Sequence, residues 1–278
     1  MPDIAIVTCR VLPEPDPDEA PLLEACAAAG LDVELAAWDD PAVDWGRYRV
    51  AILRSCWNYY QDPPSFRSWI DRVSAATSLW NYPDVVRGNL DKRYLARLAD
   101  LGVPIVPTRF LNPESSIRDA LAETGWERFV IKPTISAASF MTRRFCRSEL
   151  EAAEAFVCEV LSGREAMLQP YIESVDRGGE IAAVHIDGVL THCVVKTPRF
   201  VGGDESVSVA FQPNVSQAAA ARHVMNAIKA PWLYARVDLM EASTGEWLLS
   251  ELELIEPSLF LSQHPPALRR LIAALQRL

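Results

Sequence analysis

The sequence predicts an α/β fold that starts with a parallel sheet and becomes richer in strands toward its carboxyl-terminal end. Short apolar runs alternate with helical stretches over the first 80 residues, in the order strand, helix, strand, strand, helix. That order is typical of a parallel sheet with helices packed on it. Two later pairs of apolar runs, each joined by a turn that contains glycine, predict antiparallel hairpins.

The amino-terminal elements are predicted from apolar runs and from residues that begin or end helices. Gly30 ends the first helix, and Pro63 begins the second at a position where the missing N–H costs little. Strands are expected at residues 4–7, 33–38 and 50–53, and helices at 18–29 and 63–75.

The central elements follow the same signals. Asn89 is expected to cap a helix over 90–101, which Gly102 would end. Further strands are expected at 105–111, 129–132 and 167–172, and further helices at 115–123 and 148–161.

The carboxyl-terminal part contains the two predicted hairpins. Asp187-Gly188 would join strands at 181–186 and 189–196, and a turn around Gly245 would join strands at 233–240 and 247–254. A strand at 206–211 and helices at 216–229 and from 266 onward complete the list. Changes in composition predict three domains, at 1–88, 89–165 and 166–278.

Composition excludes several classes of protein. The 278 residues carry 27 Lys and Arg against 37 Asp and Glu, a net charge of −10, which argues against nucleic-acid binding. No apolar run approaches the roughly 18 residues of a membrane span, and the start of the chain does not resemble a secretion signal. The six scattered cysteines form no C-x-x-C pair. We therefore expect a cytoplasmic protein with no membrane partner. Hydrolase motifs such as H-E-x-x-H and G-x-S-x-G are missing.

Three carboxylates are candidates for a metal site. Glu251 and Glu253 lie two residues apart on a predicted strand, so their side chains point to the same face. Asp238 lies on the strand that the Gly245 turn would pair with this one. Oxygen ligands of this kind suit Mg²⁺. The alternative is a solvated sheet face that Arg236 balances.

Lysine is rare in this chain and occurs at positions suited to anions. Only four of the 27 cations are lysines. Lys132 ends an apolar strand, and Lys92 opens a predicted helix, where a bound anion would offset an unfavourable helix dipole. The segment 134–143, with Ser136 and Ser139, is rich in small and hydroxyl-bearing residues that can donate hydrogen bonds to phosphate oxygens. The alternative is ordinary surface lysines with buried stems.

Taken in order, these features resemble the ATP-grasp superfamily of carboxylate–amine ligases. The match covers about residues 88–278, and the first domain resembles the small α/β domain that precedes this fold. Residues 90–92 and 130–133 resemble the two nucleotide-binding lysine motifs, and 135–143 the loop over the phosphates. Gln169-Pro170-Tyr171-Ile172 resembles the hinge that reads adenine, and Gly179-Glu180 the acidic residue on the ribose side.

The resemblance implies a role for each candidate. Lys92, Lys132, Ser136 and Ser139 would bind phosphates, and Gln169, Tyr171 and Glu180 would bind adenosine. Asp238, Glu251 and Glu253 would hold Mg²⁺. Lys196 would meet the γ-phosphate or the acyl oxygen, and Arg236 would stabilise an acylphosphate. Arg54, Trp57, Asn58 and Asn89 would recognise the acceptor or the carboxylate of the substrate.

Three phrases, 54–59, 89–95 and 251–260, resemble the subgroup that contains D-cycloserine synthetase, an O-ureido-serine cyclo-ligase. The implied reaction uses ATP to activate a carboxylate of a small amino-acid-like substrate and forms a C–N bond, either within one molecule or between two. A protein that binds nucleotide without ligase activity is the alternative, as is a structural α/β protein. The oligomeric state, a homodimer included, stays open.

Overall fold

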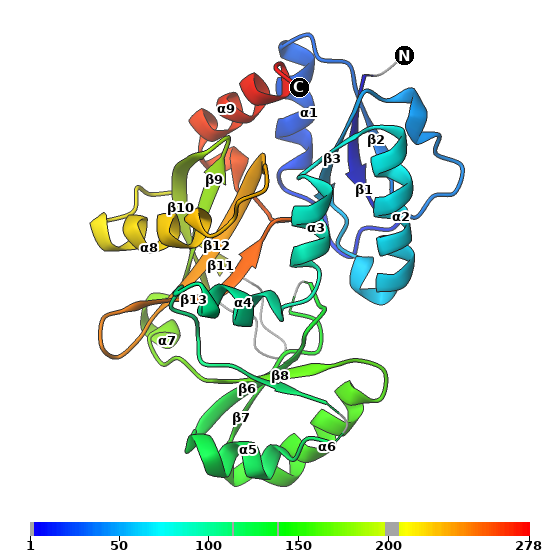
Figure 1. Cartoon of the computed structure of the whole chain (residues 1–278). Coiled ribbons are helices and arrows are strands. Elements are labelled where there is room, and N and C mark those ends of the chain that lie inside the picture. Colours follow the sequence, from blue (N-terminus) through cyan, green and yellow to red (C-terminus); the bar gives the residue numbers. More distant parts are fainter. Residues whose placement is uncertain (1–2, 113, 138, 198–205) are drawn as a thin grey trace.

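The computed structural model describes residues 3–112, 114–137, 139–197 and 206–278. Within these ranges the chain forms three sheets (Figure 1). Sheet A comes from the amino-terminal part, sheet C from the central part, and sheet B from the part after residue 179. The mixture of a parallel sheet with antiparallel ones confirms the predicted α/β class.

Sheet A is parallel throughout, as predicted, because its strands are connected by helices. Its strands are β1 (Ile4–Thr8), β2 (Val33–Ala37), β3 (Val50–Ser55) and β4 (Ser78–Trp80), in the order β2-β1-β3-β4. Alternate side chains of β1 and β3 pack toward α1 (Glu19–Ala28) on one face and α2 (Pro63–Ala76) on the other. Burial on both faces explains why these strands are uninterrupted apolar runs.

Sheet C is antiparallel and lies at the bottom of Figure 1. It consists of β5 (Arg109–Leu111), β6 (Arg128–Pro133), β7 (Arg143–Cys146) and β8 (Ala166–Pro170), in the order β5-β8-β6-β7. α5 (Ile117–Thr124) and α6 (Leu150–Leu161) cover one face and share an apolar core with it. β7 was not predicted, because its two arginines hide the apolar pattern of a strand.

Sheet B contains both predicted hairpins, which the structure confirms. β9 (Glu180–Ile186) pairs with β10 (Val189–Thr197), and β12 (Tyr234–Glu241) pairs with β13 (Trp247–Glu253). The short β11 (Ser206–Val207) completes the order β11-β10-β9-β12-β13. The helices of this part are α7 (Val175–Gly178), α8 (Val215–Asn226) and α9 (Pro265–Leu275), and α9 packs beside α1 (Figure 1).

The predicted helix over 90–101 is wrong at its start. The chain instead forms α3 (Pro83–Asn89) and, after a break, α4 (Tyr94–Asp100). Asn89 is the last residue of α3 and caps no helix, because its amide group is used elsewhere: it donates to the Leu252 carbonyl at 2.8 Å and accepts from the Leu254 N–H at 2.9 Å. Within the ranges that the structure describes, four short 3₁₀ helices complete the fold, at Trp45–Arg47, Tyr59–Gln61, Arg147–Glu149 and Leu261–Gln263.

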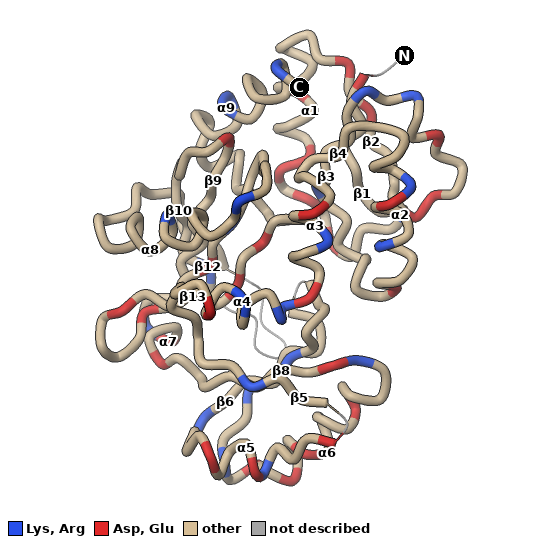
Figure 2. The backbone as a smooth tube through the Cα atoms, in the orientation of Figure 1, with Lys and Arg blue, Asp and Glu red and all other residues tan. Residues whose placement is uncertain are grey.

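Charge is distributed over the whole described chain. Figure 2 shows basic and acidic residues interspersed around the three sheets. Across the described residues, every helix is too short or too polar to cross a bilayer.

Candidate active site

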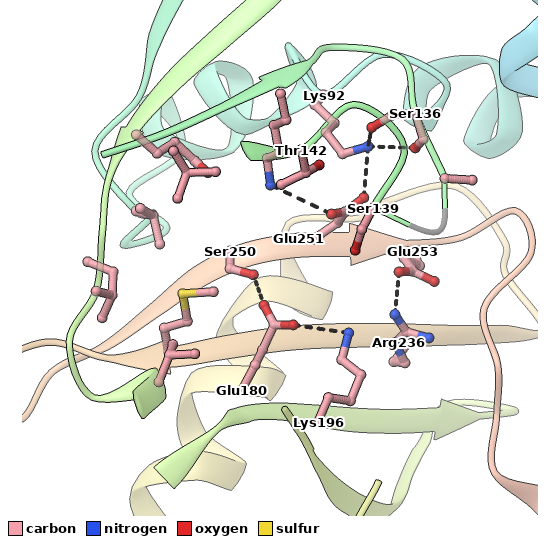
Figure 3. A pocket seen from close by; sticks show the side chains of 18 of the residues that line it. Lys92, Ser136, Ser139, Thr142, Glu180, Lys196, Arg236, Ser250, Glu251 and Glu253 are labelled. Carbon is pink, nitrogen blue, oxygen red and sulfur yellow. Dashed lines mark hydrogen bonds and ion pairs between the residues drawn. The ribbon is translucent and has the colours of Figure 1, made fainter. Parts of the chain in front are cut away.

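A cleft lies between sheet C, with the loop that follows β6, and the strands of sheet B (Figure 3). Most of the predicted site residues reach its lining although they come from all parts of the chain: Trp57, Lys92, Lys132, Ser136, Ser139, Gln169, Tyr171, Glu180, Lys196, Arg236, Glu251 and Glu253. The loop residue Ala138 lies outside the described part. The tertiary structure thus brings residues that are far apart in the sequence together in one cleft.

One end of the cleft is built around Glu251 on β13. Its carboxylate lies 3.0 Å from Lys92 Nζ and 3.8 Å from Lys132 Nζ, and these lysines come from different segments, before α4 and on β6. Lys92 also donates to the Ser136 carbonyl at 2.7 Å and to its hydroxyl at 3.1 Å. Burial lowers the pKa of Lys132. Burial opposes ionisation of Glu251, but the two lysines outweigh it and lower the pKa of this carboxyl. The pair of cations suits an anionic ligand such as phosphate.

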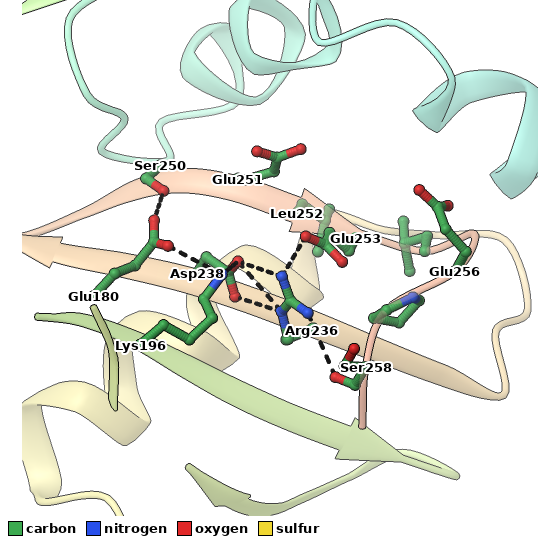
Figure 4. Close-up of polar contacts among 12 residues, drawn as sticks. Glu180, Lys196, Arg236, Asp238, Ser250, Glu251, Leu252, Glu253, Glu256 and Ser258 are labelled. Atoms are coloured by element: carbon green, nitrogen blue, oxygen red, sulfur yellow. Dashed lines mark hydrogen bonds and ion pairs between the residues drawn. The ribbon is translucent and has the colours of Figure 1, made fainter. Parts of the chain in front are cut away.

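A second charge network lies on the face of β9, β10 and β12 (Figure 4). Lys196 Nζ lies 3.0 Å from Glu180 and 2.5 Å from Asp238, while Arg236 bonds Asp238 at 2.9 Å and also pairs with Glu253. Burial opposes these charges, yet Arg236 and Lys196 together lower the pKa of Asp238. The acidic neighbours hold the pKa of Lys196 above its ordinary value, against burial and Arg236. Lys196, Arg236 and Asp238 therefore stabilise one another in their charged forms.

The three carboxylates predicted to bind Mg²⁺ differ in how well their surroundings suit a metal ligand. Glu251 and Glu253 line the cleft, and burial together with the Asp238 charge raises the pKa of Glu253 to about 7 despite Arg236. A divalent cation would favour the ionised form of such a group, so these two residues fit a magnesium site. Asp238 lies beneath them, 1% exposed, with Lys196 and Arg236 as partners. Within the described ranges no three acidic, His or Cys side chains are grouped as a metal site, so Asp238 as a ligand stays a prediction.

The opposite end of the cleft is less charged. Gln169 donates to the Thr108 hydroxyl at 2.9 Å, and the Tyr171 hydroxyl donates to Asp176. The Arg128 guanidinium carbon lies 4.2 Å from the centre of the Tyr171 ring. Apolar side chains also line the cleft, namely Val106, Val130, Ile172, Val175 and Met240. Such a surface suits a flat ring system with a few polar edges.

Of the four residues predicted to recognise a substrate, one lines the cleft and three do not. Trp57 lines the cleft. Arg54 is 2% exposed and pairs with Asp18 at 3.3 Å, and Asn58 bonds Trp38 and Asp39. Arg54, Asn58 and Asn89 lie outside the cleft lining and have partners within the protein. Their direct contact with a substrate stays a prediction.

Several residues of the lining were not predicted, and Glu256 is the most important. Glu256, Ser258 and Phe260 follow β13 and line the cleft beside Trp57. They belong to the phrase 251–260, but the strand alternation that predicts the directions of Glu251 and Glu253 ends with β13 at Glu253. Ser250 and Glu14 were also missed, whereas Thr142 belongs to the predicted segment 134–143. No local pattern assigns these side chains to the cleft.

Comparisons with known proteins agree with this architecture. A family model for the amino-terminal domain of D-cycloserine synthetase DcsG matches residues 4–81. The cycloserine biosynthesis protein DcsG of Streptomyces lavendulae is 38% identical over 278 residues, 93% of each chain. A crystal structure of D-cycloserine synthetase DcsG superimposes with a TM-score of 0.91 at 36% identity, over 99% of this chain and 98% of that one.

A more distant structure shares the fold. The ATP-grasp ligase PsnB, complexed with a minimal precursor, Mg and ADP, has a TM-score of 0.65 at 19% identity, over 98% of this chain and 96% of that one. Since identity to the DcsG protein extends over nearly the whole chain, the protein belongs to the D-cycloserine synthetase (DcsG) family of ATP-grasp ligases.

Proposed function

We propose that this ligase closes an O-ureido-serine-like amino acid into a ring, using ATP and Mg²⁺. The observation that carries the proposal is the meeting of Lys92 and Lys132 at Glu251, beside a second network with Lys196 and Arg236. An acyl-transfer reaction that proceeds through a phosphorylated carboxylate needs such concentrated positive charge. The similarity to a cycloserine biosynthesis protein supports the choice of substrate class.

In the proposed reaction the substrate carboxylate takes the γ-phosphoryl group and ADP leaves. A nitrogen of the substrate then attacks the acyl carbon, loses a proton and displaces inorganic phosphate. Lys92 and Lys132 hold the phosphates, with the hydroxyls of Ser136 and Ser139 as further donors. Lys196 and Arg236 face the transferred group and the acyl oxygen. Positioning and charge neutralisation are thus the contribution of the protein.

The remaining roles concern the nucleotide and the metal. Gln169 and Tyr171 place the adenine ring at the less charged end of the cleft, and Glu180 lies on the ribose side. Glu251 and Glu253 hold Mg²⁺, with Asp238 beneath them. When bound, the metal neutralises charge on the phosphate oxygens. The structure of the ATP-grasp ligase PsnB with Mg and ADP supports a nucleotide and a magnesium ion as ligands of this fold.

The test is ADP release from purified protein with ATP and Mg²⁺, against both enantiomers of O-ureido-serine, D-alanine, other amino acids and dipeptides. We expect release with one enantiomer of O-ureido-serine and a product lighter than the substrate. A product heavier than the substrate would show joining of two molecules and would contradict ring closure. ATP binding without ADP release for any substrate would contradict the proposal as a whole.

A further inference from the structure

We infer that Glu256 forms a subsite for the positively charged amino group of the substrate. The inference rests on the proposed function, because it assumes an amino-acid-like substrate whose carboxylate is directed toward the phosphates. It concerns a residue that neither the strand pattern nor the lysine motifs indicate.

Glu256 is buried, yet its side chain belongs to the cleft. The residue is 8% exposed and lies in the cleft lining, three residues beyond the end of β13. Two bonds from the amino-terminal part fix its backbone: Trp57 Nε1 donates to the Glu256 carbonyl at 2.9 Å, and Arg54 donates to the Pro257 carbonyl at 3.1 Å. In Figure 4 its carboxyl group rises from the chain on the same side as that of Glu251. The backbone that carries this carboxylate is therefore held in place.

Three other glutamates of the cleft have cationic partners, which Glu256 lacks among the described residues. Glu251 is paired with two lysines, Glu180 with Lys196, and Glu253 with Arg236. Among the described residues, the Glu256 carboxylate has neither an ion pair nor a hydrogen bond. Burial, followed by the charge of Glu253, accordingly raises the pKa of Glu256 to about 8. A buried carboxyl group without a cation is costly unless a ligand supplies one.

A zwitterionic amino acid supplies that cation. Once its carboxylate is directed at the γ-phosphate, the ammonium group is the charge that still needs a partner in the cleft. Around Glu256 the lining adds the aromatic rings of Trp57 and Phe260 and the hydroxyl group of Ser258. Aromatic faces and hydroxyl oxygens both interact favourably with an ammonium group. The composition of this corner therefore matches an alkylammonium ion.

The test compares two substrates in two proteins. The first substrate is the O-ureido-serine enantiomer that supports ADP release, and the second is its analogue without the amino group, 3-(ureidooxy)propanoate. For Glu256→Gln we expect the KM of the amino acid to rise about 10- to 100-fold, because the variant loses one charge-assisted hydrogen bond to the substrate. The KM of ATP should stay within about twofold, and the analogue should react equally poorly with both proteins. Glu256→Asp, which keeps the charge, should recover part of the loss.

The controls separate this subsite from other roles. Glu246→Gln makes the same change at an exposed site on the β12–β13 turn and should leave both KM values unchanged. An equal loss on both substrates would show a structural role and would overturn the subsite. A raised Mg²⁺ requirement with an unchanged KM of the amino acid would overturn it in favour of a metal ligand. Lack of ADP release by the unmodified protein would overturn the proposed function itself.

Discussion

The indole N–H of Trp57 donates a hydrogen bond to the backbone carbonyl of Glu256 at 2.9 Å, across 199 residues of sequence. The bond joins the segment after β3 to the segment after β13. Together with the bond from Arg54 to Pro257, it holds the chain that carries Glu256, Ser258 and Phe260 against the amino-terminal part. Two of the sequence phrases that resemble one subgroup are therefore in direct contact. The amino-terminal part shapes the cleft through this contact.

Trp57→Phe is expected to raise the KM of the amino-acid substrate more than that of ATP. The change removes the N–H donor and leaves the buried Glu256 carbonyl without this partner, which costs about 1–3 kcal/mol locally. Steady-state kinetics with each substrate varied in turn is the measurement. Equal effects on the two KM values, or an effect on kcat alone, would contradict a positioning role for Trp57.

The buried pair of Arg54 with Asp18 is expected to stabilise the fold. Both side chains are almost fully buried, and Asp18 also accepts from the N–H groups of Leu259 and Leu261 at 2.6 and 2.7 Å. Arg54→Met leaves a buried carboxylate without its cation and should lower the free energy of unfolding by about 3–5 kcal/mol in urea titrations. Arg118→Met is the matched control at an exposed pair with Glu154, where we expect about 0–1 kcal/mol. Similar losses in the two variants would refute the assignment.

Glu251→Gln is expected to reduce ADP release by at least about 100-fold at saturating ATP, a loss of roughly 3 kcal/mol in transition-state stabilisation. The variant removes the carboxylate that we propose binds Mg²⁺ and that is the shared partner of Lys92 and Lys132. Lys132→Ala should cause a comparable loss, because it removes a cation that we propose binds phosphate. Full activity in either variant would contradict the assigned site, whereas Glu246→Gln should behave as the unmodified protein.

The stability of the ligand-free protein should depend on pH through Glu256. Its pKa is raised from 4.5 to about 8, so between these values the folded protein binds a proton that the unfolded chain has released. The free energy of unfolding therefore falls as pH rises through this window. Glutamine cannot titrate, so Glu256→Gln should match the unmodified protein near pH 4.5 and exceed its Tm by at least about 2 °C at pH 8.5. An equal difference in Tm at both pH values would contradict a titrating Glu256.

Local patterns in the sequence predicted much of the fold and of the charged site. Alternation along β13 places Glu251 and Glu253 on the cleft side, because Leu252 and Leu254 enter the apolar core. The turns at Gly188 and Gly245 predicted the pairing of β9 with β10 and of β12 with β13. These signals are short-range, since strand periodicity and turn geometry depend on adjacent residues.

Tertiary structure decided which of the polar residues reach the cleft. Asn89 resembled a helix cap, but two backbone groups near β13 use its amide. Arg54 is predicted to contact the substrate, which stays a prediction, and in the structure its guanidinium group bonds Asp18 and the Pro257 carbonyl. Glu256 lies beyond the end of a strand, where periodicity no longer predicts direction. Its place depends on partners about 200 residues away in sequence, and such contacts arise only when separately formed sheets pack together and must satisfy each other's buried polar groups.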